Sequence, residues 1–209
     1  MQETKSFYQF LYKFVDLSED EYNQIILPYI QLRRFKKKQL VTKEGEVENY
    51  LNFLVNGLAR KFYVSNEEQH TVQLSVEGSI IHVQESFHGR KPAEFSIETV
   101  EPCTFVSITH DDLERIYSTN SKMERLGRLV ITFNMLQQAK RQMLMMKHTP
   151  RERFMHLVMN NSELLHRVPQ KFLASYLNIQ PETFSRFKHL VRVKKGKNGT
   201  NGNGNHTFG

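Results

Sequence analysis

Several residue types and patterns that define whole classes of protein are scarce in this sequence. Its 209 residues include one cysteine, Cys103, so a single chain has neither an internal disulfide framework nor enough thiolates for an iron–sulfur cluster. Apolar runs such as residues 53–55 are far shorter than the ~20 residues of a membrane-spanning helix. The N-terminus lacks a basic segment followed by an apolar one, so we expect no signal peptide and a cytoplasmic protein with no membrane partner.

The chain contains, in contrast, enough apolar side chains for packed domains and a strongly localised positive charge. Hydrophobic residues make up 39% of the sequence and aromatic residues 11%, which excludes a wholly disordered chain. Residues 148–209 contain 10 of the 29 basic and three of the 22 acidic residues and so carry the whole net charge of +7. Because residues 1–147 are balanced, this break indicates two units with different partners, the second partner being an anion.

The first unit is predicted to begin with helices. Apolar residues recur near the N-terminus at three- and four-residue spacing, as on one face of a helix. This stripe comprises Phe7, Phe10, Leu11, Phe14 and Leu17. Ser18 and Glu21 have the spacing of a capping box, which predicts the start of a second, short helix. We expect both helices to pack over a sheet.

Between residues 33 and 108, short apolar runs alternate with turn residues, which is typical of a β-sandwich or jelly roll. The expected strands are residues 40–42, 50–55, 59–64, 71–76, 79–83, 95–100 and 104–108. The expected fold class is therefore α+β. It comprises an N-terminal double-stranded β-helix (jelly roll) with flanking helices, a long helix, and a C-terminal all-α domain.

This first unit contains no strong catalytic motif. Its histidines at positions 70, 82, 88 and 110 do not pair at the alternate spacing that directs two imidazoles to one side of a strand. No nucleophile elbow or phosphate-binding loop is present either, so we expect no enzyme, no metal and no cofactor. One alternative stays open, because His82 and Glu85 supply the residue types that a metal-dependent barrel oxygenase needs.

Residues 118–147 are predicted to form one long helix that joins two chains. Asn120 and Ser121 suit its N-cap, and Gly127 alone interrupts it, at a cost of about 1 kcal/mol relative to Ala. Two neighbouring seams at heptad-like spacing are suited to a parallel partner helix. They comprise Leu126, Leu129, Val130, Phe133, Leu136, Gln137, Lys140, Met143 and Leu144. The polar members of the seams favour dimerisation, and burial of the helix against its own barrel is the alternative.

Residues 169–190 have the spacing of a helix-turn-helix. A first, apolar helix is followed by Asn178, a residue type that tolerates the left-handed conformation of a tight turn. Pro181 suits the first position of a second helix, along which Phe184 and Phe187 are expected to point inward. In a helix-turn-helix the second helix enters the major groove of DNA. An ordinary helical hairpin with a polar face is the alternative.

The outward face of that second helix contains side chains suited to DNA. The candidate contacts are Gln180, Glu182, Thr183, Ser185, Arg186, Lys188 and His189, together with Lys171 of the first helix. Arg186 has the reach for a bidentate bond to guanine, and Glu182 is able to accept a hydrogen bond from a cytosine amino group. Thr183, Ser185 and Lys188 are better suited to phosphate contacts that position the helix.

The order of barrel, long helix and helix-turn-helix resembles the Crp/Fnr superfamily of bacterial transcription regulators. Residues 167–186, RVPQKFLASYLNIQPETFSR, resemble members from Bacteroidetes-type bacteria in particular. The resemblance implies a β-roll of the cyclic-nucleotide-binding type that senses a ligand, a dimer helix, and recognition of a palindromic operator, with RNA polymerase as a further candidate partner. Glu182, Thr183 and Arg186 match the family's base-contacting pattern, whereas Pro181 stands where a further basic residue is frequent.

The expected ligand site departs from that family. Its cyclic-nucleotide binders hold the ribose with a Glu and the phosphate with an Arg a few residues further on. Here Glu85 matches the ribose-binding Glu, but Ala93 stands in the place of the Arg, so we expect no binding of cyclic AMP and an effector of unknown identity. The candidate effector pocket comprises Glu85, Ser86, Arg90 and Ser96. Arg90 or Lys91 is a possible substitute for the missing cation.

Four parts are therefore expected. They are a β-roll domain at 1–117, the dimerisation helix at 118–147, a helix-turn-helix domain at 148–192, and a flexible basic Gly/Asn-rich tail at 193–209, with a hinge at 147–150. Whether the tail follows the DNA backbone through its lysines or has no role stays open.

The leading hypothesis is a homodimeric, sequence-specific DNA-binding regulator. A ligand-binding signalling module that acts through protein partners, and the metal-dependent barrel enzyme, are the alternatives.

Overall fold

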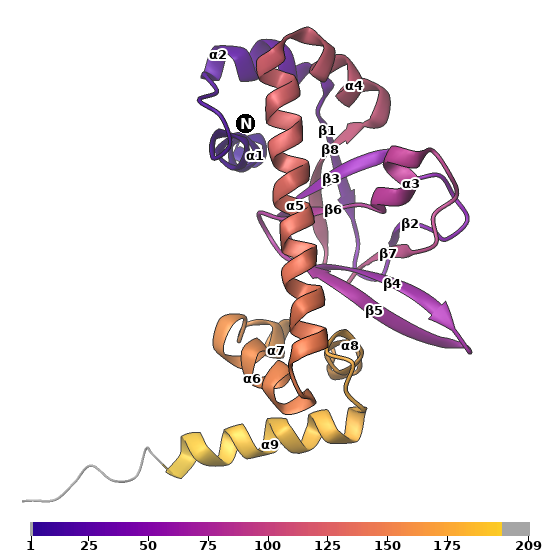
Figure 1. Ribbon diagram of the computed structural model, residues 1–209, viewed down its shortest axis with the longest axis vertical. Helices are drawn as coiled ribbons and strands as arrows, with labels where there is room; N and C mark the ends of the chain where they lie inside the picture. The colour runs from indigo at the N-terminus through magenta and orange to yellow at the C-terminus, as the bar shows by residue number, and fades with distance from the viewer. Residues whose placement is uncertain (1, 198–209) are drawn as a thin grey trace, which may run out of the picture. The chain divides into compact units, whose positions relative to one another are not determined.

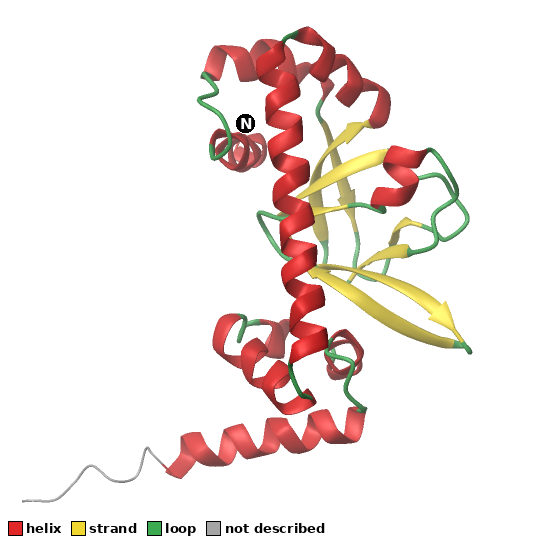
Figure 2. Cartoon of the chain, in the orientation of Figure 1, coloured by secondary structure: helices red, strands yellow, loops and turns green. Residues whose placement is uncertain are grey.

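The computed structural model describes residues 2–197 and divides into two compact units, with the division between Leu144 and Met145 (Figures 1 and 2). Helix α5 (Ser121–Lys147) crosses this division and contributes most of its length to the first unit. The hinge expected at 147–150 lies just beyond the division. Of the helices described, none combines the length and the apolar character that crossing a bilayer requires.

Within residues 2–197, eight strands form two four-stranded antiparallel sheets, which confirms the α+β fold class with an N-terminal β-sandwich. The strand orders are β1-β8-β3-β6 and β2-β7-β4-β5. The strands are β1 Gln31–Phe35, β2 Leu40–Thr42, β3 Tyr50–Asn56, β4 Ala59–Ser65, β5 Glu68–Ser75, β6 Ile80–Ile81, β7 Ser96–Thr99 and β8 Cys103–Thr109. All seven predicted strands are present. Strand β1 was not predicted, because it is a sheet edge with mostly polar, partly exposed residues.

Helices flank the sheets of the first unit. They are α1 Gln2–Tyr12, α2 Glu19–Glu21, a π-helix at Tyr22–Ile26, a 3-10 helix at Leu27–Tyr29, α3 Gln84–Gly89, α4 His110–Thr119 and α5. The predicted capping box is confirmed, since the Glu21 amide donates to Ser18 Oγ at 3.2 Å and the Ser18 amide donates to Glu21 Oε2 at 2.9 Å. The predicted N-terminal stripe was too long, because α1 ends at Tyr12. Leu17 is nevertheless buried from the segment that follows the helix.

The long helix begins later than the predicted residue 118. Residues 118 and 119 belong to α4, and Asn120 is extended, with φ −166° and ψ 166°. As the sequence predicts, Asn120 caps α5, since its Oδ1 accepts a hydrogen bond from the Met123 amide at 3.0 Å. The cap lies near the start of the predicted segment, so residues 118 and 119 end α4 and residues 121–147 form one continuous helix.

Two apolar cores stabilise the first unit. One lies between the two sheets and includes Leu54, Ile97 and Phe105, each fully buried. The other lies where α1, α4 and α5 cover the sheet of β3 and β8, and there Phe7 and Phe10 pack against the Phe53 ring with centroids 5.1 and 5.2 Å apart. Figure 2 shows the yellow strands of this unit beside the red length of α5.

The second unit is helical throughout its described part. Its helices are α6 Pro150–Asn160, α7 Leu164–Arg167, α8 Gln170–Tyr176 and α9 Pro181–Lys197. Helix α9 extends five residues into the segment 193–209 that we expected to be a tail, since Val, Arg and Lys after residue 190 allow the helix to continue. The rest of the predicted tail, residues 198–209, lies outside the described residues.

Gly127 explains how α4 and α5 pack so closely. A Cβ atom at this position would lie 2.3 Å from the Tyr117 ring of α4, closer than real Cβ contacts allow. Gly127 is therefore required by its neighbour, even though glycine is a poor residue for the interior of a helix.

We expect Gly127→Ala to lower the free energy of unfolding by about 1 kcal/mol, and by at most about 2 kcal/mol when Ala returns its full helix propensity. Overpacking costs about 1–3 kcal/mol, and the better helix propensity of Ala returns up to about 1 kcal/mol. Urea unfolding measures the change. Gly89→Ala is the control, because its nearest neighbour, Lys91 Cγ, is 3.7 Å away. A Gly127→Ala protein as stable as the wild type, or one not rescued by Tyr117→Ala, contradicts this explanation.

Candidate functional site

The predicted effector residues surround helix α3 and the loop that follows it. Ser86 Oγ accepts from the Glu48 amide at 2.9 Å and donates to the Lys91 carbonyl. Ser96 Oγ accepts from the Glu44 amide at 3.0 Å. Both hydroxyls therefore bind main-chain groups of the neighbouring loops, and the bonds of Ser86 hold α3 on the β-roll.

Arg90 ends α3 in the left-handed conformation, with φ 49°, and its guanidinium turns back toward the chain. It donates to the Glu48 carbonyl at 2.8 Å, to the Phe87 carbonyl at 3.3 Å and to Asn49 Oδ1 at 2.7 Å. Lys91 is exposed, with its Nζ 3.9 Å from Glu94 Oε1. Of the two candidate cations, Arg90 thus binds oxygen atoms of its own chain, and Lys91 lies at the surface.

Lys61 is a buried lysine inside the β-roll that was not among the predicted site residues. Lys61 pairs with Ile97 across β4 and β7, so both side chains point toward the core between the sheets, and Lys61 is only 7% exposed. Burial lowers the pKa of its ammonium group, while the nearby carboxylates of Glu85 and Glu48 oppose that shift. The signal available in the sequence was the position of Lys61, two residues after Ala59 and therefore on the same face of the strand as that core residue.

Two further buried atoms face this part of the β-roll. Glu85 Oε1 and His82 Nε2 have no hydrogen-bond partner among residues 2–197. Burial, followed by the charges of His88 and Lys61, lowers the pKa of His82 to about 3, so its imidazole is neutral at physiological pH. Over the described chain, no three His, Cys, Asp or Glu side chains are grouped so as to hold a metal ion.

The structure therefore predicts an acid-dependent loss of stability that depends on His82. The unfolded chain takes up a proton near pH 6.5, whereas folded His82 stays neutral down to about pH 3. Between those values the free energy of unfolding falls with decreasing pH, by up to ~1.4 kcal/mol per pH unit from this group. Urea unfolding from pH 7 to pH 4 should give a shallower slope for His82→Leu than for wild type. An unchanged slope, equal to that of a His70→Leu control, contradicts the assignment.

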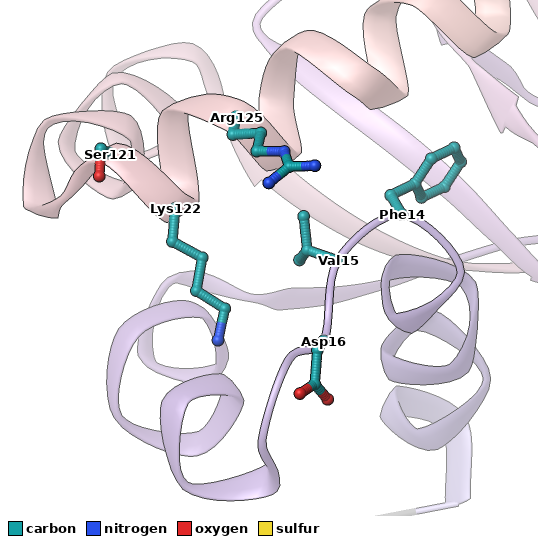
Figure 3. A pocket seen from close by; sticks show the side chains of 6 residues that line it. All are labelled: Phe14, Val15, Asp16, Ser121, Lys122 and Arg125. Carbon is teal, nitrogen blue, oxygen red and sulfur yellow. The ribbon is translucent and has the colours of Figure 1, made fainter.

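A large open cavity lies elsewhere in the first unit, between the end of α1 and the start of α5 (Figure 3). Its volume is about 620 Å³, and it is lined by Phe14, Val15, Asp16, Ser121, Lys122 and Arg125. Lys122 Nζ binds both carboxylate oxygens of Glu21, at 2.6 and 2.7 Å, which lowers the pKa of Glu21. None of the predicted effector residues lines this cavity.

The predicted dimer helix changes from buried to exposed along its length. Leu126 and Val130 are buried in the core of the first unit, at 4% and 7% exposure. Leu129 and Leu144 are half-buried, and Gln137 and Lys140 are exposed. Phe133 and Leu136 are 39% and 52% exposed, and so are other apolar residues of this segment, namely Ile131, Met135, Met143 and Met146. The start of α5 thus packs on its own barrel, and the rest keeps an apolar surface.

In the second unit, a tight turn joins α8 and α9 at the place that the sequence spacing predicts. Asn178 has φ 51°, the left-handed conformation, between α8 and α9. Leu173 and Ala174 of α8 are fully buried, and Phe184 of α9 packs edge-on against Phe154 of α6 with ring centroids 5.2 Å apart. The turn is closed by the Ile179 amide, which donates to the Ala174 carbonyl at 2.9 Å. The tight turn follows from an asparagine that tolerates the left-handed conformation, and the buried inner faces follow from the apolar residues of the two helices.

The candidate DNA contacts lie on the outer face of α9 and beside it. Gln180, Glu182, Ser185, Arg186 and His189 are exposed, as is Lys171 on α8, while Thr183 and Lys188 are half-buried. Arg186 Nη2 donates to Thr183 Oγ1, one helical turn earlier, at 3.2 Å. The other N–H groups of the guanidinium take no part in this hydrogen bond. Lys171 Nζ lies 5.1 Å from the Phe172 ring centroid. The exposed face of α9 thus presents the carboxylate of Glu182 and the guanidinium of Arg186, and α8 presents the ammonium of Lys171.

One segment of the chain matches a known protein family. Residues 32–120 match the family described as the cyclic nucleotide-binding domain. This segment contains the two sheets and α3, and it ends where α5 begins. No curated protein matches the chain in sequence.

Comparison with solved structures extends the similarity over both units. FixK2 from Bradyrhizobium japonicum has a TM-score of 0.66 at 15% identity, covering 79% of this chain and 86% of its own. The c-di-GMP-responsive global regulator CLP from Xanthomonas campestris has a TM-score of 0.66 at 13% identity, covering 85% and 93%. The catabolite activator protein of Thermus thermophilus has a TM-score of 0.54 at 16% identity, covering 89% and 88%. At these identities the similarity shows the fold.

Proposed function

Because residues 32–120 form a cyclic nucleotide-binding domain in a chain with the fold of Crp/Fnr-type regulators, we propose that the protein is a homodimeric, sequence-specific DNA-binding transcription regulator. The structural neighbours include proteins named as a global regulator and a catabolite activator. Operator DNA and a second copy of the chain are its proposed partners, and RNA polymerase is a further candidate.

The exposed face of α9 is the single observation that carries this proposal. Helix α9 follows a left-handed turn, buries Phe184 on one side, and presents Glu182 and Arg186 on the other. In a helix-turn-helix, the N-terminal residues of the second helix contact base edges. The excess positive charge of residues 148–209 supports the same partner, because phosphate contacts supply most of the non-specific affinity for DNA.

Dimerisation is proposed through the exposed apolar residues of α5. Phe133, Leu136 and Met143 leave a substantial part of their side chains exposed in a single chain, and an exposed apolar stripe of this kind marks an interaction surface. A parallel pair of α5 helices would relate the two α9 helices by a twofold axis. The operator is then a palindrome with half-sites about 34 Å apart, one turn of DNA.

The β-roll is proposed to respond to something other than cyclic AMP. Ala93, 3% exposed, stands where the resemblance expects the phosphate-binding Arg, and Arg90 is already bonded to three oxygen atoms of its own chain. Of the buried cations, Lys61 lies near the carboxylates of Glu85 and Glu48, and Arg60 is paired with Glu98. A phosphate buried without a dedicated cation is costly, so a cyclic nucleotide has no favourable position here.

Selection of binding sequences from a random duplex library tests the proposed function. The expected result is enrichment of a palindrome, bound with an affinity that falls steeply as salt increases. If no sequence is enriched over competitor DNA and binding is insensitive to salt, the proposal fails.

Two substitutions on α9 test the roles of individual side chains. Arg186→Ala should remove ~1–3 kcal/mol of discrimination at one base position, roughly 5- to 150-fold, because a bidentate contact to guanine is lost. Lys188→Ala should weaken binding to all sequences alike and reduce the salt slope by about 1. Fluorescence anisotropy on the selected operator and its single-base variants measures both. Equal, sequence-independent losses for the two variants contradict these roles.

Cyclic AMP should leave the thermal stability of the protein unchanged. A ligand at 100 times its Kd stabilises the folded state by about 2.7 kcal/mol, which thermal denaturation detects as a rise in Tm. We expect no rise at millimolar cyclic AMP for the wild type. A rise that is lost in Glu85→Gln would show that the nucleotide does bind in the β-roll.

A further inference from the structure

Arg153 is a buried arginine at the centre of the second unit. It lies on α6, just after the Thr149 cap, and is 7% exposed. A buried guanidinium is costly unless its N–H groups are satisfied, so its hydrogen bonds show which parts of the structure it holds together.

Within residues 2–197, the guanidinium of Arg153 donates to main-chain carbonyl oxygens in two places. Nε donates to the Leu177 carbonyl at 2.8 Å, and Nη2 donates to the Asn178 carbonyl at 2.9 Å. Nη1 donates to the His148 carbonyl at 2.8 Å and, more weakly, to the Met145 carbonyl at 3.4 Å. The first pair belongs to the turn before α9, and the second pair belongs to the last turn of α5 and the residue after it.

Both places are C-terminal ends of helices. The last carbonyls of a helix have no partner within it, and they carry the negative end of the helix dipole. One guanidinium therefore satisfies the ends of α8 and α5 at once. Its planar fork is what allows four bonds in two directions, which the single nitrogen of lysine would not reproduce.

The helix-turn-helix does not need Arg153 for its own closure. The Leu177 amide donates to the Leu173 carbonyl at 3.0 Å, the Ile179 amide donates to the Ala174 carbonyl at 2.9 Å, and Phe184 packs on Phe154. These contacts hold α8, the turn and α9 together. What Arg153 adds is a bonded link between that turn and the last turn of α5.

We infer that Arg153 is a positioning residue, which sets the direction of recognition helix α9 relative to the end of α5. The inference rests on the proposed function, because only in a dimer that binds two half-sites does this direction determine which operator spacing fits. Arg153 touches no DNA in this role. Its loss should leave recognition of one half-site intact and remove the preference for one spacing between two half-sites.

A series of duplexes tests this inference. One duplex contains a single half-site, and the others contain two half-sites whose separation changes one base pair at a time. Wild-type protein should bind best at one separation. Arg153→Met should bind the single half-site within about twofold of wild type, lose at least tenfold in affinity at the best separation, and bind neighbouring separations almost equally well.

Arg151→Met is the matched control. Arg151 lies on the same helical turn and is exposed, so this variant removes the same charge without the carbonyl bonds. It should keep the spacing preference of the wild type. Arg153→Lys keeps the charge and should behave like Arg153→Met. If Arg153→Met keeps the wild-type spacing preference, or if Arg151→Met loses it equally, the inference is overturned.

A measurement without DNA separates this inference from the proposed function. Spin labels at Met146 and Ser185, both exposed, are placed in a Cys103→Ala chain diluted with unlabelled protein. The distance distribution should be narrow for Arg151→Met and broad for Arg153→Lys and Arg153→Met. That result supports the positioning role even if the wild type binds no operator, whereas equally narrow distributions overturn it. Arg153→Lys serves if Arg153→Met does not fold.

Discussion

A single helix, α5, has to cover its own β-roll at one end and leave apolar side chains exposed along the rest of its length. Met123, Leu126 and Val130 are buried with the first unit, and the close approach of Tyr117 requires glycine at position 127. From Ile131 onward the apolar side chains are largely exposed. The sequence allowed two interpretations of this helix, burial against its own barrel or pairing with a second chain. In the structure, the beginning of α5 is buried against its own barrel. The proposed dimer depends on pairing of the exposed remainder of α5 with a second chain.

Much of the fold follows from local patterns in the sequence. The strands, the Ser18 capping box, the Asn120 cap and the left-handed Asn178 each depend on residues close together in the chain, and each was predicted. Strand β1 was missed because an edge strand needs no alternation of polar and apolar residues. The burial of Lys61 and Arg153 was missed for a different reason, since their partners are distant in sequence and only tertiary packing brings them together.

The β-roll shows why a domain family does not determine a ligand. Residues 32–120 match the cyclic nucleotide-binding domain, yet several polar groups around α3 are hydrogen-bonded within the chain. Ser86, Ser96 and Arg90 bind loop main-chain groups, and Lys61 lies near Glu85 inside the roll. The match to the domain family indicates the fold of the two sheets, whereas the ligand chemistry of a fold depends on a few side chains. The net positive charge of this chain is carried by residues 148–209.

The number of chains bound per operator tests the central claim most directly. Sedimentation velocity on the selected palindromic duplex, at protein concentrations above the Kd, gives the mass of the complex. Two chains per duplex, falling to weak or single occupancy when one half-site is scrambled, is the result that a dimeric DNA-binding regulator predicts. A single chain bound with full affinity, or equal occupancy on a fully scrambled duplex, would contradict it.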